Sequence, residues 1–205
     1  EDDAACCEAS KQEIIRRYYH ALNDFANGDV SEAVVNRIAR LFKQVGITTA
    51  NRRTTVAANE RKDRTGAIAV AAIELHDGHI ITAEASSLLG SSAALLINAT
   101  KYLAGIDHNV KLIPQEMIEP IQYTKINYLQ GRNPRLHTDE VLIAIAITAT
   151  TNPVAQLAMD SLEKLKNSEF HSTVILSEVD MNTLKKLGIH VTCEPQYQTK
   201  KLYHG

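Results

Sequence analysis

The chain has 205 residues, a formal charge of −2 and 44% hydrophobic residues, which is enough to bury a substantial core. The charge gives no general attraction to phosphate backbones or anionic membranes, and 5% aromatic residues without Trp offer few base-stacking platforms. The composition therefore disfavours nucleic-acid and membrane partners. The longest apolar run, Val141–Ala149, is too short to span a bilayer. Cys6, Cys7 and Cys193 do not resemble a disulfide framework, so a cytoplasmic location is the simplest.

Residues 1–50 predict a helical hairpin. Apolar residues recur at helical spacing over Ala5–Asn27, and Ser31 is placed to cap a second helix that ends near Val45. The helical pattern begins at Glu1 without an initiator Met. This abrupt start favours a fragment cut from a longer protein.

Residues 51–112 predict the first half of an α/β subdomain. It combines a polar helix, two strands joined by a tight turn at Asp77-Gly78, and a buried helix. We expect both turn residues to supply positive φ angles. The expected elements are a helix at Arg52–Arg64, strands at Ile68–Leu75 and Ile80–Ala85, and a helix at Gly90–Leu103.

Residues 113–167 predict a helical insertion, and residues 168–205 predict the second half of the subdomain with a basic tail. The expected helices of the insertion are Gln115–Leu129, Thr138–Thr150 and Val154–Lys166. The expected elements of the second half are a strand at Ser172–Leu176, a helix at Asp180–Leu187, a strand at Ile189–Cys193 and a tail from Tyr197. Each strand pair is too small to fold alone, so we expect one mixed sheet covered by helices on both faces.

The segment Ser86–Ser92 is the strongest candidate for ligand binding. Hydroxyl groups and free amides at the start of a helix are suited to holding an anion. The predicted ligand-binding residues are Ser86, Ser87, Gly90, Ser91, Ser92 and Arg135. The alternative is that the serines only cap the helix and allow close packing, since neither GxxxxGK[ST] nor GxGxxG is present.

Three residues are candidates for catalysis. His137 precedes a predicted helix and is a candidate proton donor, while Cys193 and Glu194 end a predicted strand, where ligands gather in open α/β sheets. The alternatives are an ordinary helix start at His137, and a buried cysteine beside a surface glutamate. No metal site is predicted, because the spacings HExxH and CxxC are absent.

The strings SSLLGSSAALLINATKYLAGI, NPRLHTDEVLIAIAI and KKLGIHVTCEPQYQTKKLYH resemble the C-terminal part of a bacterial family, domain-of-unknown-function family 1846. The resemblance implies a three-layer α/β/α mixed sheet of cytidine-deaminase-like topology with attached helical segments. Because family members are longer, it also implies that the chain's own N-terminal domain is missing here and is its partner. Ser91 and Ser92 stand where a deaminase would carry zinc residues. No cofactor is evident, and a nucleotide is the class left open.

Two functions follow as expectations. In the first, the chain is the C-terminal region of an uncharacterised cytosolic bacterial protein that binds a small anionic or nucleotide-like metabolite at Ser86–Ser92. In the second, it is a non-catalytic region that packs and oligomerises in the service of an N-terminal catalytic domain. The nearly all-apolar segment Val141–Ala149 supports the second expectation and a homo-oligomer.

Overall fold

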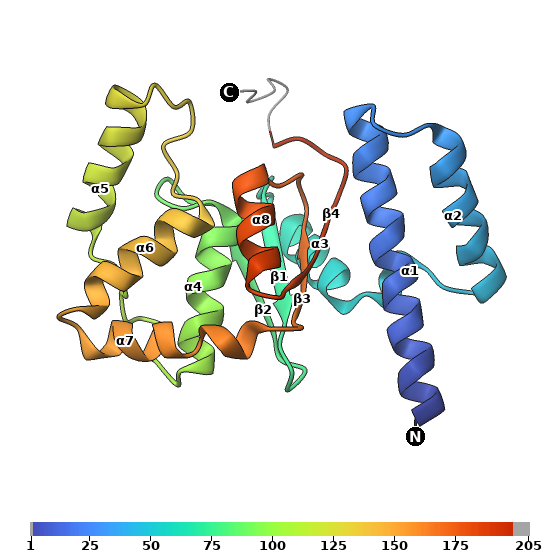
Figure 1. Cartoon of the computed structure of the whole chain (residues 1–205), viewed down its shortest axis with the longest axis horizontal. Coiled ribbons are helices and arrows are strands. Elements are labelled where there is room, and N and C mark those ends of the chain that lie inside the picture. The colour runs from blue at the N-terminus through green and yellow to red at the C-terminus, as the bar shows by residue number, and fades with distance from the viewer. Residues whose placement is uncertain (1, 199–205) are drawn as a thin grey trace.

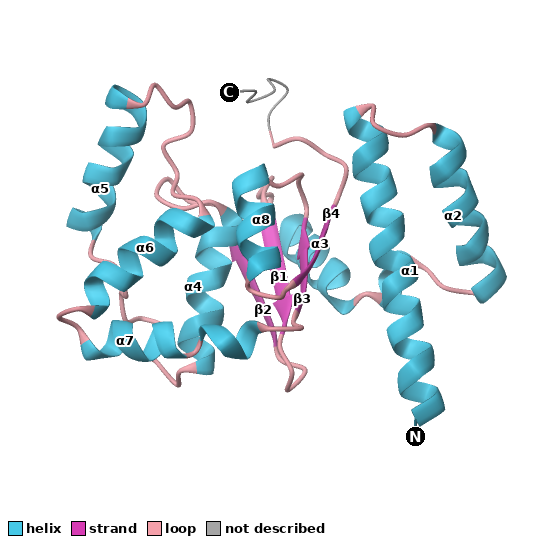
Figure 2. Cartoon of the chain, in the orientation of Figure 1, coloured by secondary structure: helices cyan, strands magenta, loops and turns pink. Residues whose placement is uncertain are grey.

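A computed structural model describes residues 2–198, and this part of the chain contains eight α-helices and a four-stranded sheet (Figures 1 and 2). The helices are α1 (Asp2–Asn27), α2 (Glu32–Val45), α3 (Arg53–Thr65), α4 (Ser91–Leu103), α5 (Gln115–Tyr123), α6 (Thr138–Ala149), α7 (Pro153–Asp160) and α8 (Glu178–Lys186). The strands are β1 (Val70–Glu74), β2 (Ile80–Glu84), β3 (Glu169–Ser172) and β4 (His190–Cys193).

The strands form one mixed sheet in the order β2-β1-β3-β4, which confirms the prediction that the two strand groups share a sheet. β1 pairs antiparallel with both β2 and β3, whereas β3 and β4 are parallel. Helix α3 packs on one face of the sheet, while α4 and α8 pack on the other. The molecule is therefore a mixed α/β fold with helices on both faces of the sheet.

Strand β1 is apolar at nearly every position because both of its faces are covered. Ala71 and Ile73 belong to the large core beneath α4 and α8. Val70 and Ala72 instead pack against Ala58 of α3. The continuous apolar run in the sequence thus reports burial on two sides.

The β1–β2 turn differs from the prediction in its backbone. The amide of Leu75 donates to the carbonyl of His79 at 3.0 Å, and the amide of Gly78 donates to the carbonyl of Leu75 at 2.9 Å. Of the two predicted turn residues only Gly78 has a positive φ, +78°. A three-residue loop of this kind needs a single left-handed residue, so Asp77 is free to keep ordinary backbone angles.

The prediction of a strand at Ser172–Leu176 is wrong in its position along the chain, because β3 covers Glu169–Ser172. Its pairing with β4 places Glu169 opposite His190 and Ser172 opposite Cys193. A polar residue can begin this strand because Arg52 and Arg16 both bind the Glu169 carboxylate. His171, which directly precedes the predicted strand, is consequently an interior residue of β3.

Two predicted helices are also shorter than expected. The segment predicted as Gln115–Leu129 is α5 followed by a π-helical turn at Thr124–Tyr128, and Pro120 removes one backbone donor inside α5. The segment predicted as Val154–Lys166 is α7 followed by a 3₁₀ turn at Leu162–Leu165. The basic tail beyond Gln198 lies outside the described residues. Within residues 2–198, no helix combines the length and apolar character needed to cross a membrane.

The long helix α1 covers the β4 edge of the sheet and packs against α2 (Figure 1). The side-chain amide of Asn23 donates to the carbonyl of Cys193 at 2.8 Å, and Nε2 of His20 lies 3.2 Å from the carbonyl oxygen of Val191. These contacts occupy backbone groups that an exposed edge strand would leave unpaired. They also bring the last turns of α1 beside the ends of β3 and β4.

Candidate functional site

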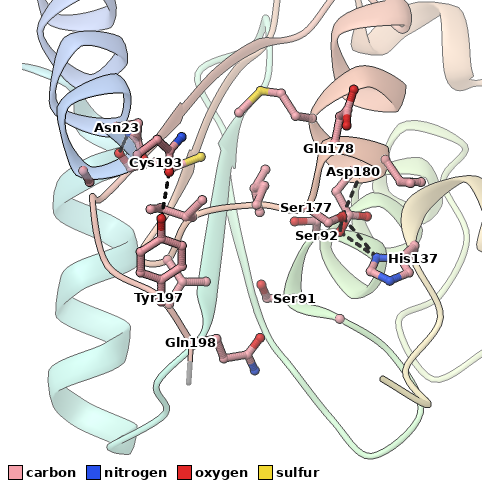
Figure 3. A pocket seen from close by; sticks show the side chains of 18 of the residues that line it. Asn23, Ser91, Ser92, His137, Ser177, Glu178, Asp180, Cys193, Tyr197 and Gln198 are labelled. Atoms are coloured by element: carbon pink, nitrogen blue, oxygen red, sulfur yellow. Dashed lines mark hydrogen bonds and ion pairs between the residues drawn. The ribbon is translucent and has the colours of Figure 1, made fainter. Parts of the chain in front are cut away.

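A cleft of about 1510 Å³ lies where the last turns of α1 face the starts of α4, α6 and α8. The segments that follow β3 and β4 form its floor, so it occupies the usual ligand position of an open α/β sheet. Figure 3 shows Asn23, Cys193 and Tyr197 on one side, with Ser92, His137 and Asp180 on the other.

Three helices begin at this cleft, and they differ in whether a side chain accepts a backbone amide at the helix start. Ser177 caps α8 by accepting the amide of Asp180 at 3.2 Å, and Glu140 closes the start of α6 by accepting the amide of His137 at 2.7 Å. Helix α4 follows Gly90, and no side chain in residues 2–198 caps it. The first amides of α4 therefore remain available at the positive end of the helix dipole.

Ser91 and Ser92 add hydroxyl groups to the same helix start. Their residues are only 5% and 2% exposed, yet both line the cleft. Neither hydroxyl has a hydrogen-bond partner among the residues that the structure describes, although Figure 3 shows both side chains at the cleft. Because both residues line the cleft, their hydroxyls can donate to an acceptor placed there.

His137 and Asp180 form the strongest polar contact of the cleft. Nδ1 of His137 lies 2.9 Å from Oδ2 of Asp180, which also accepts the hydroxyl of Ser177 at 2.8 Å. The other carboxylate oxygen accepts the amide of Thr138 at 2.8 Å. The hydrogen bond to Asp180 raises the pKa of His137 above its ordinary value of 6.5. The imidazole of His137 is thus held beside Asp180 at the edge of the cleft.

Arg135 also lines the cleft, and its position depends on the serine loop. Its Nε donates to the backbone carbonyl of Ser86 at 2.6 Å. In the described part of the chain, its two terminal nitrogens make no hydrogen bond. The guanidinium is therefore held at one nitrogen and open at the other two.

The other two predicted serines lie outside the cleft lining. The hydroxyl of Ser86 accepts the amides of Leu88 and Leu89 at 3.2 and 3.0 Å, and so shapes the loop before α4. Ser87 is exposed, and its carbonyl accepts the side-chain amide of Gln122 at 3.1 Å. Of the predicted ligand residues, the structure brings together Gly90, Ser91, Ser92 and Arg135 at the cleft.

Cys193 and Glu194 were predicted as neighbours in one site, but they belong to opposite sides of the sheet. Cys193 lines the cleft, and burial raises the pKa of its thiol to about 12, so the thiol is neutral near pH 7. Glu194 instead accepts the hydroxyl of Tyr19 at 3.1 Å, and its carboxylate lies 3.3 Å from Nε2 of the buried His171. Only Cys193 belongs to the cleft.

The sequence reasoning missed Ser177 and Asp180, although a signal was present. The spacing Ser177-x-x-Asp180 is a capping-box pattern, which predicts a helix start at this point. That pattern could not reveal that Asp180 also reaches the start of α6. Among the described residues, no group of three or more His, Cys, Asp or Glu side chains is arranged to hold a metal ion.

Comparison with known proteins finds two family models that match this chain. Residues 50–203 match the family model "Domain of unknown function DUF1846, C-terminal", and residues 1–46 match "Domain of unknown function DUF1846, N-terminal". A UPF0371 protein of Streptococcus pneumoniae (strain CGSP14) is 53% identical over 202 residues, which cover 98% of this chain and 41% of the relative. A UPF0371 protein of Streptococcus thermophilus (strain ATCC BAA-491 / LMD-9) is 52% identical over the same share of each chain.

The expectation that the family's N-terminal domain is missing from this chain is wrong, because residues 1–46 match that domain's model. These residues include α1, so one wall of the cleft comes from the N-terminal match and the others from the C-terminal match. The chain spans 41% of the length of these two relatives. The matches to both models show that the chain belongs to the DUF1846 family, whose relatives are named UPF0371 proteins.

Proposed function

We propose that the cleft binds a small anionic metabolite, with its anionic group at the start of α4. The observation that carries this proposal is the pair of largely buried serines, Ser91 and Ser92, which line the cleft at a helix start that no described side chain caps. Backbone amides, hydroxyls and the helix dipole all favour a phosphate or a carboxylate there.

Two cationic groups support the same ligand class. The open nitrogens of Arg135 suit a bidentate contact to a phosphate or carboxylate. His137 has its Nδ1 turned to Asp180, which leaves Nε2 to donate a proton to a bound ligand. We therefore assign Arg135 as an anion clamp and His137 as the proton donor of the site. We also propose that the protein acts in the cytoplasm, where its free cysteines Cys6, Cys7 and Cys193 would stay reduced.

We also propose a cytidine-deaminase-like topology for the sheet and α4. Its support is the order β1, β2, α4 in a mixed sheet with helices on both faces. The start of α4 carries Ser91 and Ser92, and hydroxyls suit an anion better than they suit zinc, which takes Cys, His and carboxylate ligands. Anion binding thus replaces the metal chemistry that this topology usually supports.

Isothermal titration calorimetry with inorganic phosphate, and separately with malonate, tests the proposed site. Combining Ser91→Ala with Ser92→Ala should weaken binding at least about tenfold, because two hydrogen bonds to a charged group are lost. Ser87→Ala is the matched control, since Ser87 is exposed and lies outside the cleft. Equal affinities for the double variant and the control would refute the site. If neither phosphate nor malonate binds the unmodified protein, the proposal is also refuted, and the serines have only a structural role.

A further inference from the structure

We infer that the ligand of this cleft carries one anionic head and an uncharged, hydroxyl-rich body, as in a monophosphorylated sugar or polyol. This inference rests on the proposed function, because the start of α4 must hold the head. The body would lie against the last turns of α1, which form the opposite wall of the cleft.

The size of the cleft supplies the first argument. Small-molecule sites in proteins commonly enclose about 300–1,000 Å³, and this cleft has about 1510 Å³. A lone phosphate or carboxylate at Ser91 and Ser92 would leave most of that space to water. The cleft therefore has room for a ligand that extends from α4 to α1.

The charge of the α1 wall supplies the second argument. The cleft-lining residues of α1 and the turn after it include two carboxylates, Asp24 and Asp29, and none of those described is Lys or Arg. The cationic groups Arg135 and His137 lie at the helix starts instead, and Lys185, which also lines the cleft, belongs to the last turn of α8. A second phosphate directed at α1 would meet like charge, so the wall disfavours bisphosphates and dinucleotides.

The hydrogen-bonding groups of the α1 wall supply the third argument. Asp24 and Asp29 are exposed, and in the described part of the chain their side chains have no hydrogen-bond partner. Asn27 accepts the hydroxyl of Tyr197 at 2.7 Å through Oδ1, which leaves its Nδ2 free to donate. Hydroxyl groups both donate and accept, so they match this combination of carboxylate acceptors and an amide donor. An ammonium group only donates, and it would leave the Nδ2 of Asn27 without an acceptor.

Asn23 is a positioning residue for this wall. Its side-chain amide donates to the carbonyls of Tyr19 at 2.7 Å and Cys193 at 2.8 Å. The first bond lies within α1, and the second ties α1 to the end of β4. Asn23 thereby fixes the distance between the proposed body-binding wall and the floor of the cleft.

Calorimetric titration of the whole chain with a matched set of compounds tests the inference. The probes are inorganic phosphate, glucose 6-phosphate, ribose 5-phosphate, fructose 1,6-bisphosphate and phosphoethanolamine. We expect at least one sugar monophosphate to bind at least tenfold more tightly than phosphate, and the bisphosphate and the amine to gain no such advantage. The variant Asp24→Ala with Asp29→Ala should lose most of this advantage while its affinity for phosphate stays the same.

Asp63→Ala is the control, because Asp63 is an exposed aspartate of α3 outside the cleft. Phosphate binding that depends on Ser91 and Ser92, without any gain from a sugar body, would overturn this inference and leave the proposed function standing. An advantage that survives in the double aspartate variant, or an equal one for phosphoethanolamine, would also overturn it. Failure of every one of these compounds to bind would overturn the inference, and failure of malonate to bind as well would overturn the proposed function.

Discussion

The carboxylate of Asp180 accepts hydrogen bonds from His137, Thr138 and Ser177, and so joins the starts of α6 and α8. Burial by itself raises the pKa of Asp180, but the hydrogen bonds from His137 and Thr138 outweigh it and hold the pKa below its ordinary value of 3.8. The same contact raises the pKa of His137. Both shifts favour the charged pair in the folded protein.

These shifts predict how the pair's contribution to stability depends on pH. The contribution of His137 is complete below its ordinary pKa of 6.5 and is lost as pH rises through the raised value. The contribution of Asp180 is complete above its ordinary pKa of 3.8 and is lost as pH falls through the lowered value. The substitution His137→Gln should therefore lower the free energy of unfolding more at about pH 5.5 than at about pH 8.5, by on the order of 1 kcal/mol.

Urea denaturation at the two pH values measures this difference. His108→Gln is a suitable control because His108 is exposed, and within residues 2–198 its side chain makes no hydrogen bond, while its backbone carbonyl accepts one from Lys101. The control should change stability equally at both pH values. An equal penalty for His137→Gln at both values would contradict the role of the charged pair.

Cys193 gives a second prediction at the scale of a residue. With a pKa of about 12, only on the order of one thiol in ten thousand is ionised near pH 8, and the thiolate is the form that reacts. Iodoacetamide should therefore label Cys6 and Cys7, which are exposed, and spare Cys193 until urea unfolds the protein. Mass spectrometry of the digested protein reads this out, and rapid labelling of Cys193 in the folded state would show that the thiol is activated.

Among the elements, the parallel pair β3–β4 depends on one buried side chain. Arg52 is 1% exposed, and its guanidinium donates to the carbonyls of Phe170 and His190, at 2.9 and 3.0 Å. It also donates to the hydroxyl of Thr192 at 2.9 Å and forms an ion pair with Glu169. Arg52 thus fastens both strands to the start of α3.

Removing this side chain should destabilise the protein strongly. Arg52→Met leaves two strand carbonyls without their donor and weakens the pairing of a partly buried carboxylate, a loss of about 3–5 kcal/mol. Arg53→Met is the control, because Arg53 is 59% exposed in its ion pair with Glu74 and should cost less than about 1 kcal/mol. Urea denaturation distinguishes the two, and similar losses would show that Arg52 does not fasten the strands.

Element boundaries were predictable where local signals decide them. The predicted helix at Gly90–Leu103 differs from α4 by one residue, and the hairpin strands differ from β1 and β2 by two residues or fewer. The prediction for β3 failed because its start depends on Arg52 and Arg16, which are distant in sequence from Glu169. Sequence periodicity contains no information on such a partner.

At the scale of the whole molecule, the cleft exists only because segments distant in sequence meet. Its walls come from the end of α1, the starts of α4, α6 and α8, and the chain beyond β4. A ligand that bridges these walls should slow hydrogen exchange in all of them. We expect protection by a sugar monophosphate at residues 91–94 and 24–29, and none in α2.

Hydrogen–deuterium exchange followed by mass spectrometry measures this protection. Inorganic phosphate alone should protect residues 91–94 and leave residues 24–29 unchanged, because it occupies only the head position. Helix α2 serves as the internal reference, since none of its residues lines the cleft. Protection confined to α2, or absent from residues 91–94 with every ligand, would contradict the proposed location.

Most helices, the β1–β2 hairpin and the serines at the start of α4 could be predicted from the sequence. These features follow from hydrophobic period, turn residues and helix-start residues, which act over a few positions of the chain. The folded structure was needed to show which candidate residues share the cleft. Ser91, Ser92, Arg135 and His137 line it, whereas Ser86, Ser87 and Glu194 lie outside it. Strand register and helix packing determine where each side chain points, and both depend on contacts between segments that are distant in the sequence.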